Sequence, residues 1–377
     1  MSQQTTHATD EPVVSLENLR VRFEESGFLG LTGKDSVDAV DGVSLDIGEN
    51  DVVALVGESG CGKTTLGKTA IGLQQPTGGS VKYRGQDIWE AKERDRLLSL
   101  GRRGEDGIPF ADIRKSLQII HQDPESSMNA NYTVENELEQ PLKKWQPDLS
   151  RADRKARIRG LLEYVGMKPA EDYAERYPHQ LSGGEQQRVA LIRSLLMSPD
   201  LILADEAISA LDVSLRVEVM ELMLDLQEQF NTSYLFISHD LANAWYLAKK
   251  AGGRIGIMYL GELVEVGPVE EIVHDPQHPY TKALLWATPD LMSSSVEDPP
   301  IRKIDVPDPS DPPSGCRFHT RCPEAREVCG TQKPEQYEVG QEHEAGCFRV
   351  VDDHEYWNSP EIEDDSSSGP GMSTSDD

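Results

Sequence analysis

One short run near the N-terminal end has the residue types and spacing that bind phosphate. Its residues match the pattern G-x-x-x-x-G-K-[ST] at every fixed position. Glycines let backbone N–H groups turn toward an anion, the lysine can reach the β- and γ-phosphates, and the next hydroxyl can bind Mg²⁺. The alternative is a glycine-rich turn that binds nothing. The run consists of Gly57, Glu58, Ser59, Gly60, Cys61, Gly62, Lys63, Thr64 and Thr65.

The flanking residues predict the elements that would position this loop. Residues 51–56 are apolar and partly β-branched, which is typical of a strand buried on both faces. Residues 65–73 predict a helix with Leu66, Ala70 and Leu73 on one face. A helix N-terminus carries a partial positive charge, so a strand, loop and helix in this order favour a nucleoside triphosphate as ligand.

Two more predicted strands end in residues that could act on a bound nucleotide. Residues 201–204 precede Asp205 and Glu206, and residues 233–237 precede His239 by one residue. Acidic residues at the carboxyl end of a parallel strand lie where a metal–nucleotide would bind, although a solvated acidic strand end is an equal alternative. A lone histidine at a strand end is usually structural. His239 is therefore a candidate for nucleotide chemistry only because the other motifs occur in the same sequence.

A further motif stands at the start of a predicted helix. Ser182, followed three residues later by Glu185, forms a capping box, which is common at ordinary helix starts. Gly183 and Gly184 favour more than a cap, because they leave N–H groups bare where a phosphate could dock. A strand-like run, residues 117–120, leads to Gln122 in the same way.

The composition limits the partners. The 377 residues include 66 acidic and 37 basic side chains, for a formal net charge of −29. This argues against non-specific nucleic-acid binding, which depends on Lys and Arg. Acid excess keeps a protein soluble where salt screens its self-repulsion, so we expect a high-salt cytoplasm such as that of a halophilic archaeon. Residues 1–12 contain no apolar signal region, and no apolar run is long enough to span a bilayer.

The remaining pattern predicts the domain organisation. A disordered lead-in (1–12) precedes strands at 13–23, 39–47 and 79–83, and the charged segment 86–180 predicts an inserted helical subdomain. Ser150 is expected to cap one of its helices. Residues 351–377 are rich in acidic and small residues, which predicts a disordered acidic tail.

In order and spacing, these motifs over residues 13–265 resemble the ATP-binding cassette (ABC) family of transporter ATPases. The resemblance rests on the phosphate loop (57–64), Gln122, Leu-Ser-Gly-Gly at 181–184, Asp205-Glu206, Ser-Ala-Leu-Asp at 209–212, and His239. It implies an α/β fold: a RecA-like phosphate-loop ATPase core with an antiparallel β-subdomain and an inserted helical subdomain. Ala207 and Glu185 depart from the usual residues at their positions, but neither change removes a catalytic group.

The resemblance also implies roles. Lys63 and the loop backbone would hold ATP. Thr64, Asp205 and Gln122 would serve Mg²⁺, Glu206 would activate water, and His239 would contact the γ-phosphate. Ser182, Gly183 and Gly184 would complete the site of a second cassette, Asp212 is a further nucleotide-binding candidate, and Phe23 is the candidate for stacking on adenine.

Residues 266–350 resemble the C-terminal extension of the oligopeptide/dipeptide/nickel uptake subfamily. The similar segments are Gly267-Pro268, residues 278–285 and residues 315–323. Four cysteines follow the spacing C-x5-C-x6-C-x17-C, unlike the close pairs of zinc sites. Some members of the subfamily hold a [4Fe–4S] cluster on such cysteines, and zinc or free thiols are the alternatives. The residues are Cys316, Cys322, Cys329 and Cys347.

The resemblance implies an importer. Its expected partners are two membrane permease subunits, a second ABC ATPase subunit and, indirectly, an extracellular solute-binding protein, at the cytoplasmic face of the membrane. Peptides are the expected cargo, with nickel or sugars as alternatives. A soluble cassette acting on ribosomes or DNA is the rival function, and the single cassette and acidic composition argue against it.

Overall fold

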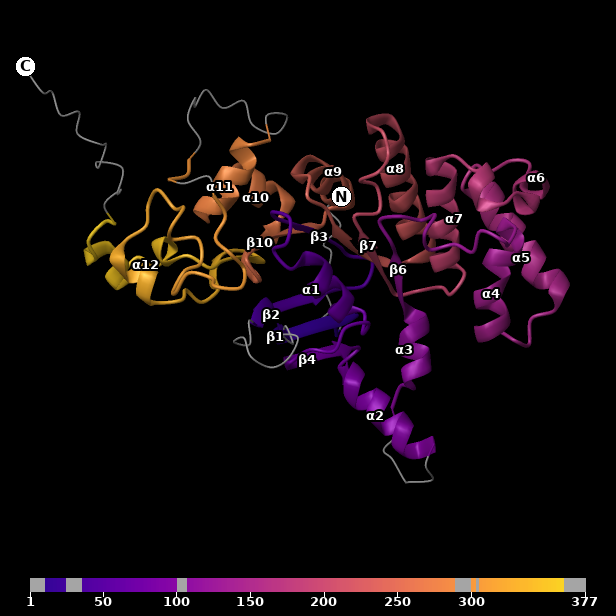
Figure 1. Ribbon diagram of the computed structural model, residues 1–377, viewed down its shortest axis with the longest axis horizontal. Coiled ribbons are helices and arrows are strands. Elements are labelled where there is room, and N and C mark those ends of the chain that lie inside the picture. The colour runs from indigo at the N-terminus through magenta and orange to yellow at the C-terminus, as the bar shows by residue number, and fades with distance from the viewer. Residues whose placement is uncertain (1–10, 25–35, 100–106, 289–299, 303–304, 363–377) are drawn as a thin grey trace, which may run out of the picture.

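The computed structural model describes residues 11–24, 36–99, 107–288, 300–302 and 305–362. In these residues two sheets form the frame of the chain (Figure 1). The strands are β1 (Val14–Glu24), β2 (Ser36–Ile47), β3 (Val52–Val56), β4 (Gly78–Tyr83), β5 (Gln86–Asp87), β6 (Leu117–Ile120), β7 (Leu201–Asp205), β8 (Ser233–Ile237), β9 (Arg254–Tyr259), β10 (Glu262–Pro268), β11 (Tyr337–Gly340) and β12 (His343–Ala345).

Helices surround both sheets. They are α1 (Lys63–Ala70), α2 (Ile88–Ser99), α3 (Phe110–Ser116), α4 (Val134–Trp145), α5 (Arg151–Tyr164), α6 (Ala170–Glu175), α7 (Gly183–Leu195), α8 (Val213–Phe230), α9 (Leu241–Ala251), α10 (Val269–His274), α11 (Pro279–Trp286) and α12 (Glu327–Thr331), with short 3-10 helices η1 (Pro178–Gln180), η2 (Phe348–Val350) and η3 (Glu355–Asn358).

The central sheet has eight strands in the order β11-β12-β10-β9-β3-β8-β7-β6. Strands β9, β3, β8, β7 and β6 run parallel to one another, whereas β10 pairs antiparallel with β9, and β12 and β11 continue the antiparallel end. All five residues of β3 are buried. Alternate residues of β3 enter opposite cores: Val52 and Ala54 lie in one cluster, and Val53 and Leu55 in the other. A strand covered on both faces has this continuous apolar sequence.

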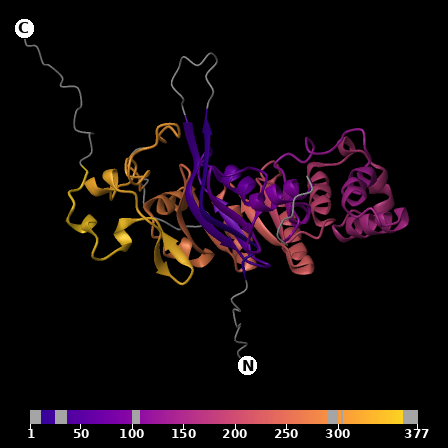
Figure 2. The ribbon, with the colours of Figure 1, turned by 90° about the horizontal axis from the view of Figure 1, so that it is seen from below.

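The smaller sheet is antiparallel, in the order β2-β1-β4-β5. It shares a hydrophobic core with α1, α2 and α3 on one face of the central sheet. Figure 2 shows β1 and β2 extending together away from the body of the chain. Leu19 and Val21 are fully buried, as the alternation predicts, whereas Phe23 at the end of β1 is 44% exposed.

Helices α4 to α9 contribute to the second core, in which α7 packs on β6, α9 packs on β3 and β9, and α4, α5 and α6 pack on one another, with α4 and α5 also on α7. In Figure 1, α4, α5 and α6 lie at the far end of the chain from the C-terminal elements. Ser150 caps α5, as predicted: its side chain accepts a hydrogen bond from the Asp153 N–H. The predicted α/β core with an antiparallel sheet and inserted helices is therefore confirmed. The subdomain bounds 86–180 stay a prediction, and within them α2 and α3 share the core of the antiparallel sheet.

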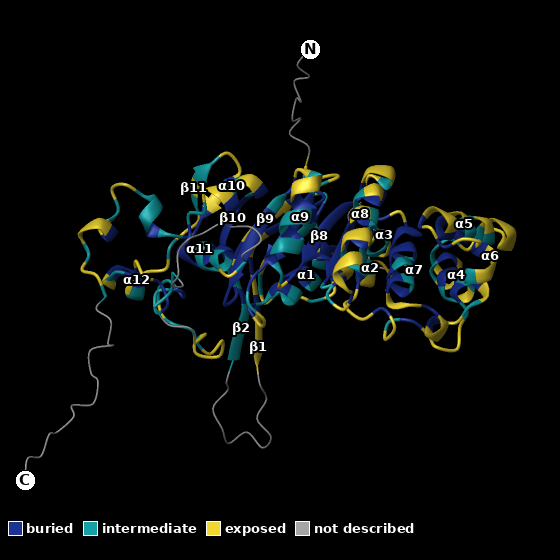
Figure 3. Cartoon of the chain, turned by 90° about the horizontal axis from the view of Figure 1, so that it is seen from above, coloured by how far each residue is buried: buried dark blue, intermediate teal, exposed yellow. Residues whose placement is uncertain are grey.

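The C-terminal residues extend the central sheet. Strands β11 and β12 join it through β10, which pairs with β12 at Glu265 and Val266. Figure 3 shows the exposed residues on the outer surfaces of this part and of the helical end, with the buried strands between them. The extension therefore continues the central sheet instead of standing apart from it.

Two expectations differ from the structure. The helix predicted over residues 65–73 ends at Ala70, because Gly72 adopts a positive φ of 67° and turns the chain, which leaves Leu73 41% exposed. In the predicted acidic tail, η3 places Tyr356 in a small core with Val328, Cys329 and Phe348. The start of the tail is therefore ordered, because a single buried aromatic side chain packs there despite the acidic composition. Residues 1–10, 25–35 and 363–377, which hold the predicted lead-in, part of the loop after β1 and the rest of the tail, lie outside the described residues.

Within the described part of the chain, none of the helices combines the length and the apolar composition that crossing a membrane requires.

Candidate active site

The strands that carry the motifs are neighbours in the central sheet. Strands β3, β8, β7 and β6 follow one another in that order and are all parallel. The carboxyl ends of parallel strands meet at one edge, where open α/β sheets bind ligands. The loop after β3, His239 after β8, Glu206 after β7 and Gln122 after β6 therefore come together, although the sequence separates them widely.

The phosphate loop joins β3 to α1, as predicted. Gly62 caps the N-terminus of α1 with φ 104°, a conformation that L side chains rarely adopt. A Cβ atom on Gly62 would also lie 2.0 Å from the carbonyl oxygen of Ala39 on β2. The glycine is therefore required here by the backbone conformation and by the close approach of β2.

Lys63 turns its amine back over the loop. Its Nζ atom donates hydrogen bonds to the carbonyl oxygens of Gly57, at 2.8 Å, and Glu58, at 3.0 Å. The lysine is 5% exposed, and Cys61 Sγ lies 3.7 Å from the same nitrogen. A buried cation at the N-terminus of a helix concentrates positive potential inside the loop, which suits an anion such as a triphosphate.

Thr64 and Asp205 meet across the sheet edge. The Thr64 hydroxyl donates to Asp205 Oδ1 at 2.9 Å, from the first turn of α1 to the end of β7. Hydroxyl and carboxylate oxygens are the ligands that Mg²⁺ prefers, and Mg²⁺ usually takes only one or two from the protein. The structure thus brings together two of the three predicted magnesium residues.

Glu206 is the meeting point of the predicted catalytic side chains. Its Oε2 atom lies 3.2 Å from Gln122 Nε2 and 3.3 Å from His239 Nδ1. Its backbone has φ 50°, and its N–H bonds to the carbonyl oxygen of Ile237 on β8 at 3.1 Å. This bond turns the chain immediately after β7, so that the carboxylate projects between the two partners.

An open cleft lies at this edge of the sheet. Its lining includes predicted residues and others that the sequence analysis missed. Lys68 stands four residues after Thr64, which places both on one face of α1, and this spacing could have identified it. Ser209, quoted within its motif, accepts a weaker contact from Gln122 Nε2 at 3.4 Å. The cleft is lined by Thr64, Lys68, His121, Gln122, Asp123, Ser126, Ser127, Asp205 and Glu206.

The Leu-Ser-Gly-Gly motif does not line this cleft. Ser182 caps α7, and the capping box is complete: Glu185 Oε2 accepts from the Ser182 N–H at 2.7 Å and from its hydroxyl at 2.9 Å. Ser182 and Gly184 line a different depression, together with Arg188 and Leu215. Ser182 and Gly183 are therefore exposed at the N-terminus of α7, outside the lining of the cleft beside the chain's own phosphate loop.

Asp212 and Phe23 are also outside the lining of this cleft. Asp212 caps α8 and accepts from the Leu215 N–H at 3.0 Å, which gives it a structural role at the least. Phe23 pairs with Val37, two residues along β2 from Ala39, the residue that touches Gly62. This register puts the aromatic ring on the strand pair nearest the phosphate loop.

The four C-terminal cysteines share one cavity. All are free thiols, and all line a space with Phe318, Phe348 and Tyr356. Burial raises the pKa of each thiol, to about 12 for Cys322 and about 11 for Cys347. Among the described residues, no three or more His, Cys, Asp or Glu side chains are arranged to hold a single metal ion.

Comparison with known proteins agrees with this geometry. The family model of ABC transporters matches residues 40–209, and the model of the oligopeptide/dipeptide transporter C-terminal region matches residues 264–329. The chain is 38% identical over 344 residues to the oligopeptide transport ATP-binding protein AppF of Bacillus subtilis (strain 168), covering 91% of this chain and 98% of AppF. It is 38% identical over 326 residues to the di/tripeptide transport ATP-binding protein DppF of Pseudomonas aeruginosa (strain UCBPP-PA14), covering 86% and 94%.

Among solved structures, the chain is similar to the dimeric post-hydrolysis state of the ATP-binding cassette MJ0796 bound to ADP and Pi. The TM-score is 0.54 at 26% identity, and the match covers 68% of this chain and 98% of that one. The relatives align over nearly their whole length, and the fold and motifs agree with the match. The chain therefore belongs to the family of ABC transporter ATP-binding proteins, the ATPase subunits of these transporters.

Proposed function

We propose that the chain hydrolyses ATP to drive the uptake of peptides through a membrane permease. The observation that carries the ATPase site is the convergence of Gln122 and His239 on Glu206 Oε2, beside the Thr64–Asp205 contact. The cargo rests on the relatives, which are named for oligopeptide and di/tripeptide transport. Nickel and sugars are the alternative cargoes that a transport assay would separate from peptides.

The residues around Glu206 divide the work of hydrolysis. Glu206 accepts the proton of the attacking water, since its carboxylate lies within 3.3 Å of both Gln122 and His239. His239 would contact the γ-phosphate, and its Nδ1 atom lies 3.3 Å from the Glu206 carboxylate. Gln122 orients the water and, because it follows β6, links the site to the segment that leads into α4.

The phosphate loop and the magnesium residues hold the substrate. Backbone N–H groups of residues 57–64 surround the β-phosphate, and Lys63 exchanges its bonds to Gly57 and Glu58 for phosphate oxygens. Thr64 and Asp205 would hold Mg²⁺, with Gln122 in the lining of the same cleft. When bound, Mg²⁺ neutralises the negative charge that the phosphates share.

A second cassette completes the site. Ser182, Gly183 and Gly184 are exposed or line a depression away from the chain's own cleft, so they suit the γ-phosphate of a facing subunit. Asp212, beside this motif, belongs to the same face. The MJ0796 cassette is titled as a dimer bound to ADP and Pi, which supports such a pairing. Closure of two cassettes on two ATP molecules would supply the power stroke, and hydrolysis would release it.

We place the chain at the cytoplasmic face of the membrane, with two permease subunits, a second ATPase subunit and a solute-binding protein outside the cell. Co-purification from membranes of the host, at its own salt concentration, tests this. Permease subunits and a second cassette in the complex would support the proposal. Ribosomal or DNA-repair proteins without membrane subunits would overturn the transport role and leave the ATPase site intact.

We propose, from the resemblance to the subfamily, that the four cysteines hold a [4Fe–4S] cluster, with zinc or free thiols as the alternatives. The cysteines line one cavity, although no three of them in the described part of the chain are arranged to hold a metal ion. The cluster would supply the positive charge that buried thiolates need. Anaerobic purification followed by iron, sulfide and zinc analysis tests the assignment, and zinc-loaded, iron-free protein would overturn it.

Phe23 is the proposed adenine platform. Its 44% exposure leaves the ring face free to stack, and its strand pair borders the phosphate loop. Phe23→Ala should weaken ATP binding and Phe23→Tyr should not. Equal affinity in both variants would assign the ring to another role.

A further inference from the structure

Two side chains of the C-terminal extension contact the phosphate loop directly. The Tyr280 hydroxyl accepts a hydrogen bond from the backbone N–H of Glu58 at 3.0 Å. The Arg321 guanidinium donates to both oxygens of the Glu58 carboxylate, each at 3.0 Å. Glu58 is thus held through its backbone and its side chain by residues more than two hundred positions later in the chain.

The Arg321–Glu58 pair is not a loose surface contact. The Arg321 side chain is 6% exposed and that of Glu58 is 29% exposed. Arg321 also donates to the Tyr259 hydroxyl at 3.4 Å, and its guanidinium carbon lies 5.7 Å from the ring centres of Tyr259 and Phe318. A bidentate, largely buried pair fixes direction as well as distance, which exposed ion pairs do not.

A buried aromatic cluster packs beneath this pair. The rings of Tyr259, Tyr280 and Phe318 lie 4.7 to 5.3 Å from one another, and each residue is at most 1% exposed. Tyr259 ends β9, and the turn after it reaches the loop as well: the Gly261 N–H donates to the Cys61 carbonyl oxygen at 2.9 Å. The phosphate loop therefore rests on an aromatic cluster that the extension completes.

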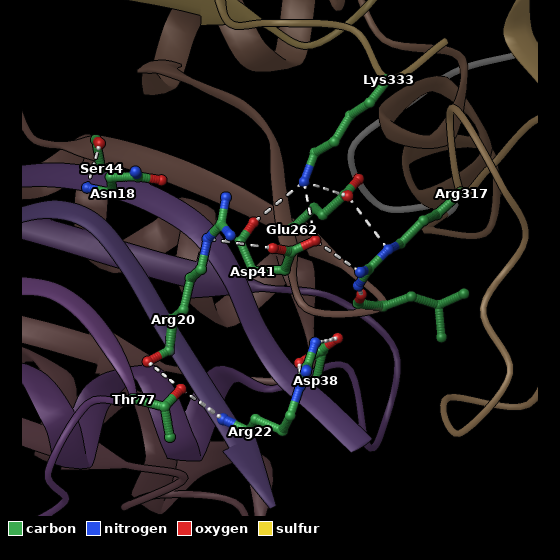
Figure 4. Close-up of polar contacts among 11 residues, drawn as sticks. Asn18, Arg20, Arg22, Asp38, Asp41, Ser44, Thr77, Glu262, Arg317 and Lys333 are labelled. Atoms are coloured by element: carbon green, nitrogen blue, oxygen red, sulfur yellow. Dashed lines mark hydrogen bonds and ion pairs between the residues drawn. The ribbon is translucent and has the colours of Figure 1, made fainter. Parts of the chain in front are cut away.

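A second arginine of the extension holds that turn. Arg317 donates to the Leu260 carbonyl oxygen and to Asp41 Oδ2, at 2.8 Å in the second case, and pairs with Glu262 at 3.2 Å. Figure 4 shows these groups with Lys333, which lies 3.0 Å from Asp41 and 2.8 Å from Glu262. The network joins the extension to β2 through Asp41 and to the start of β10 through Glu262. It therefore surrounds the β9–β10 turn, whose Gly261 bonds to Cys61.

These contacts reach the phosphate loop at Glu58, whose carbonyl oxygen also accepts a hydrogen bond from Lys63. Glu58 offers its N–H to Tyr280, its carboxylate to Arg321 and its carbonyl oxygen to Lys63 Nζ, at 3.0 Å. We propose that Arg321 and Tyr280 are positioning residues of the phosphate loop, through which the C-terminal extension sets the affinity for MgATP. The inference rests on the assignment of residues 57–64 as the phosphate-binding loop.

The expected effect is on substrate binding. Backbone N–H groups of the loop contact the phosphates in the bound state and in the transition state alike, so a misplaced loop weakens both equally. Loss of such uniform binding raises KM and leaves kcat unchanged. We expect Arg321→Gln to raise KM for MgATP on the order of tenfold, with kcat within about twofold of the wild type. Tyr280→Phe, which removes only the hydroxyl, should raise it less.

The experiment uses the full-length chain and measures ATPase kinetics and equilibrium binding of a fluorescent ATP analogue. Arg326→Gln is the matched control: Arg326 donates to the carbonyl oxygens of Tyr356 and Trp357 within the extension. Both arginine variants should lower the unfolding temperature, but only Arg321→Gln should raise KM. A rise of the same size in Arg326→Gln, or an unchanged KM in Arg321→Gln and Tyr280→Phe, would overturn the inference.

A double-mutant cycle tests whether Arg321 acts through Glu58. Adding Arg321→Gln to Glu58→Gln should change KM little further, because the carboxylate partner is already gone. Independent, multiplicative effects would contradict the proposed route. Lys63→Ala tests the loop assignment separately. If this variant binds ATP as tightly as the wild type, residues 57–64 are not the phosphate-binding loop. If it loses ATP binding while Arg321→Gln keeps wild-type kinetics, only the positioning role is overturned.

Discussion

The Nδ1 atom of His239 lies 3.3 Å from Oε2 of Glu206. The same oxygen lies 3.2 Å from Gln122 Nε2, so residues that follow β6 and β8 both contact the carboxylate that follows β7. The His239 side chain is 56% exposed, which leaves its other ring edge accessible to a phosphate. The pair therefore connects the proposed base to the group that would sense the γ-phosphate.

Glu206→Gln should bind ATP normally and lose most of its turnover. Glutamine keeps the size and the hydrogen-bonding contacts of the side chain but cannot take a proton, so kcat should fall by roughly 10² to 10⁴. Steady-state ATPase rates and nucleotide binding measure this. Glu218→Gln, on an exposed glutamate of α8 that pairs with Arg188, is the matched control. Near-normal turnover in Glu206→Gln would refute the assignment of the base.

Thr64→Ala should raise the Mg²⁺ concentration needed for half-maximal activity, on the order of tenfold, since one oxygen ligand is lost. The assay titrates MgCl₂ at constant ATP. Thr69→Ala is the control in the same helix, because its hydroxyl bonds to the Thr65 carbonyl oxygen, at 2.7 Å, and does not line the cleft. An unchanged Mg²⁺ requirement in Thr64→Ala would remove Thr64 from the metal site.

His343 should make docking of the extension depend on pH. Burial alone would lower the pKa of His343, but its hydrogen bonds to Glu265, at 2.9 Å, and Glu271, at 3.0 Å, outweigh burial and raise it above 6.5. A raised pKa in the folded state means that the stabilisation is complete below pH 6.5 and is lost as the pH rises through the folded value.

We therefore expect His343→Gln to lower the unfolding temperature at pH 6, by about 2–4 °C, and the difference to shrink toward pH 9. Thermal unfolding at constant ionic strength measures it. His274→Gln, at an exposed histidine that pairs with Glu270, is the control. A difference that stayed constant or grew with pH would show that the histidine acts by packing and not by charge.

High salt should favour the active protein. At a formal net charge of −29, the excess acidic side chains repel one another at low ionic strength. In 1 M KCl the screening length is about 3 Å, so this repulsion is largely removed at longer distances. Both ATPase activity and unfolding temperature should rise with KCl up to molar concentrations. A maximum near 0.1 M would contradict the high-salt origin, and an equal rise with another monovalent chloride would identify screening as the cause.

Local patterns predicted the motif chemistry and most of the elements around it. The strand, loop and helix around Lys63, the cap at Ser150 and the capping box at Ser182 form as expected. Each of these features depends on residues within a few positions of one another, so the local sequence is sufficient to predict it. The end of α1 differs by three residues because Gly72 turns the chain before the periodicity stops.

Tertiary structure alone decided which distant groups meet. The strand order β3-β8-β7-β6 brings Gln122, Glu206 and His239 to one edge, and that order depends on crossover connections that no local pattern records. The same holds for Arg321 on Glu58 and for the shared cysteine cavity. The sequence determined which side chains could do chemistry, because residue type and short spacing are local. The packing of the sheet and its extension decided their partners, because long-range contacts form wherever buried surfaces fit.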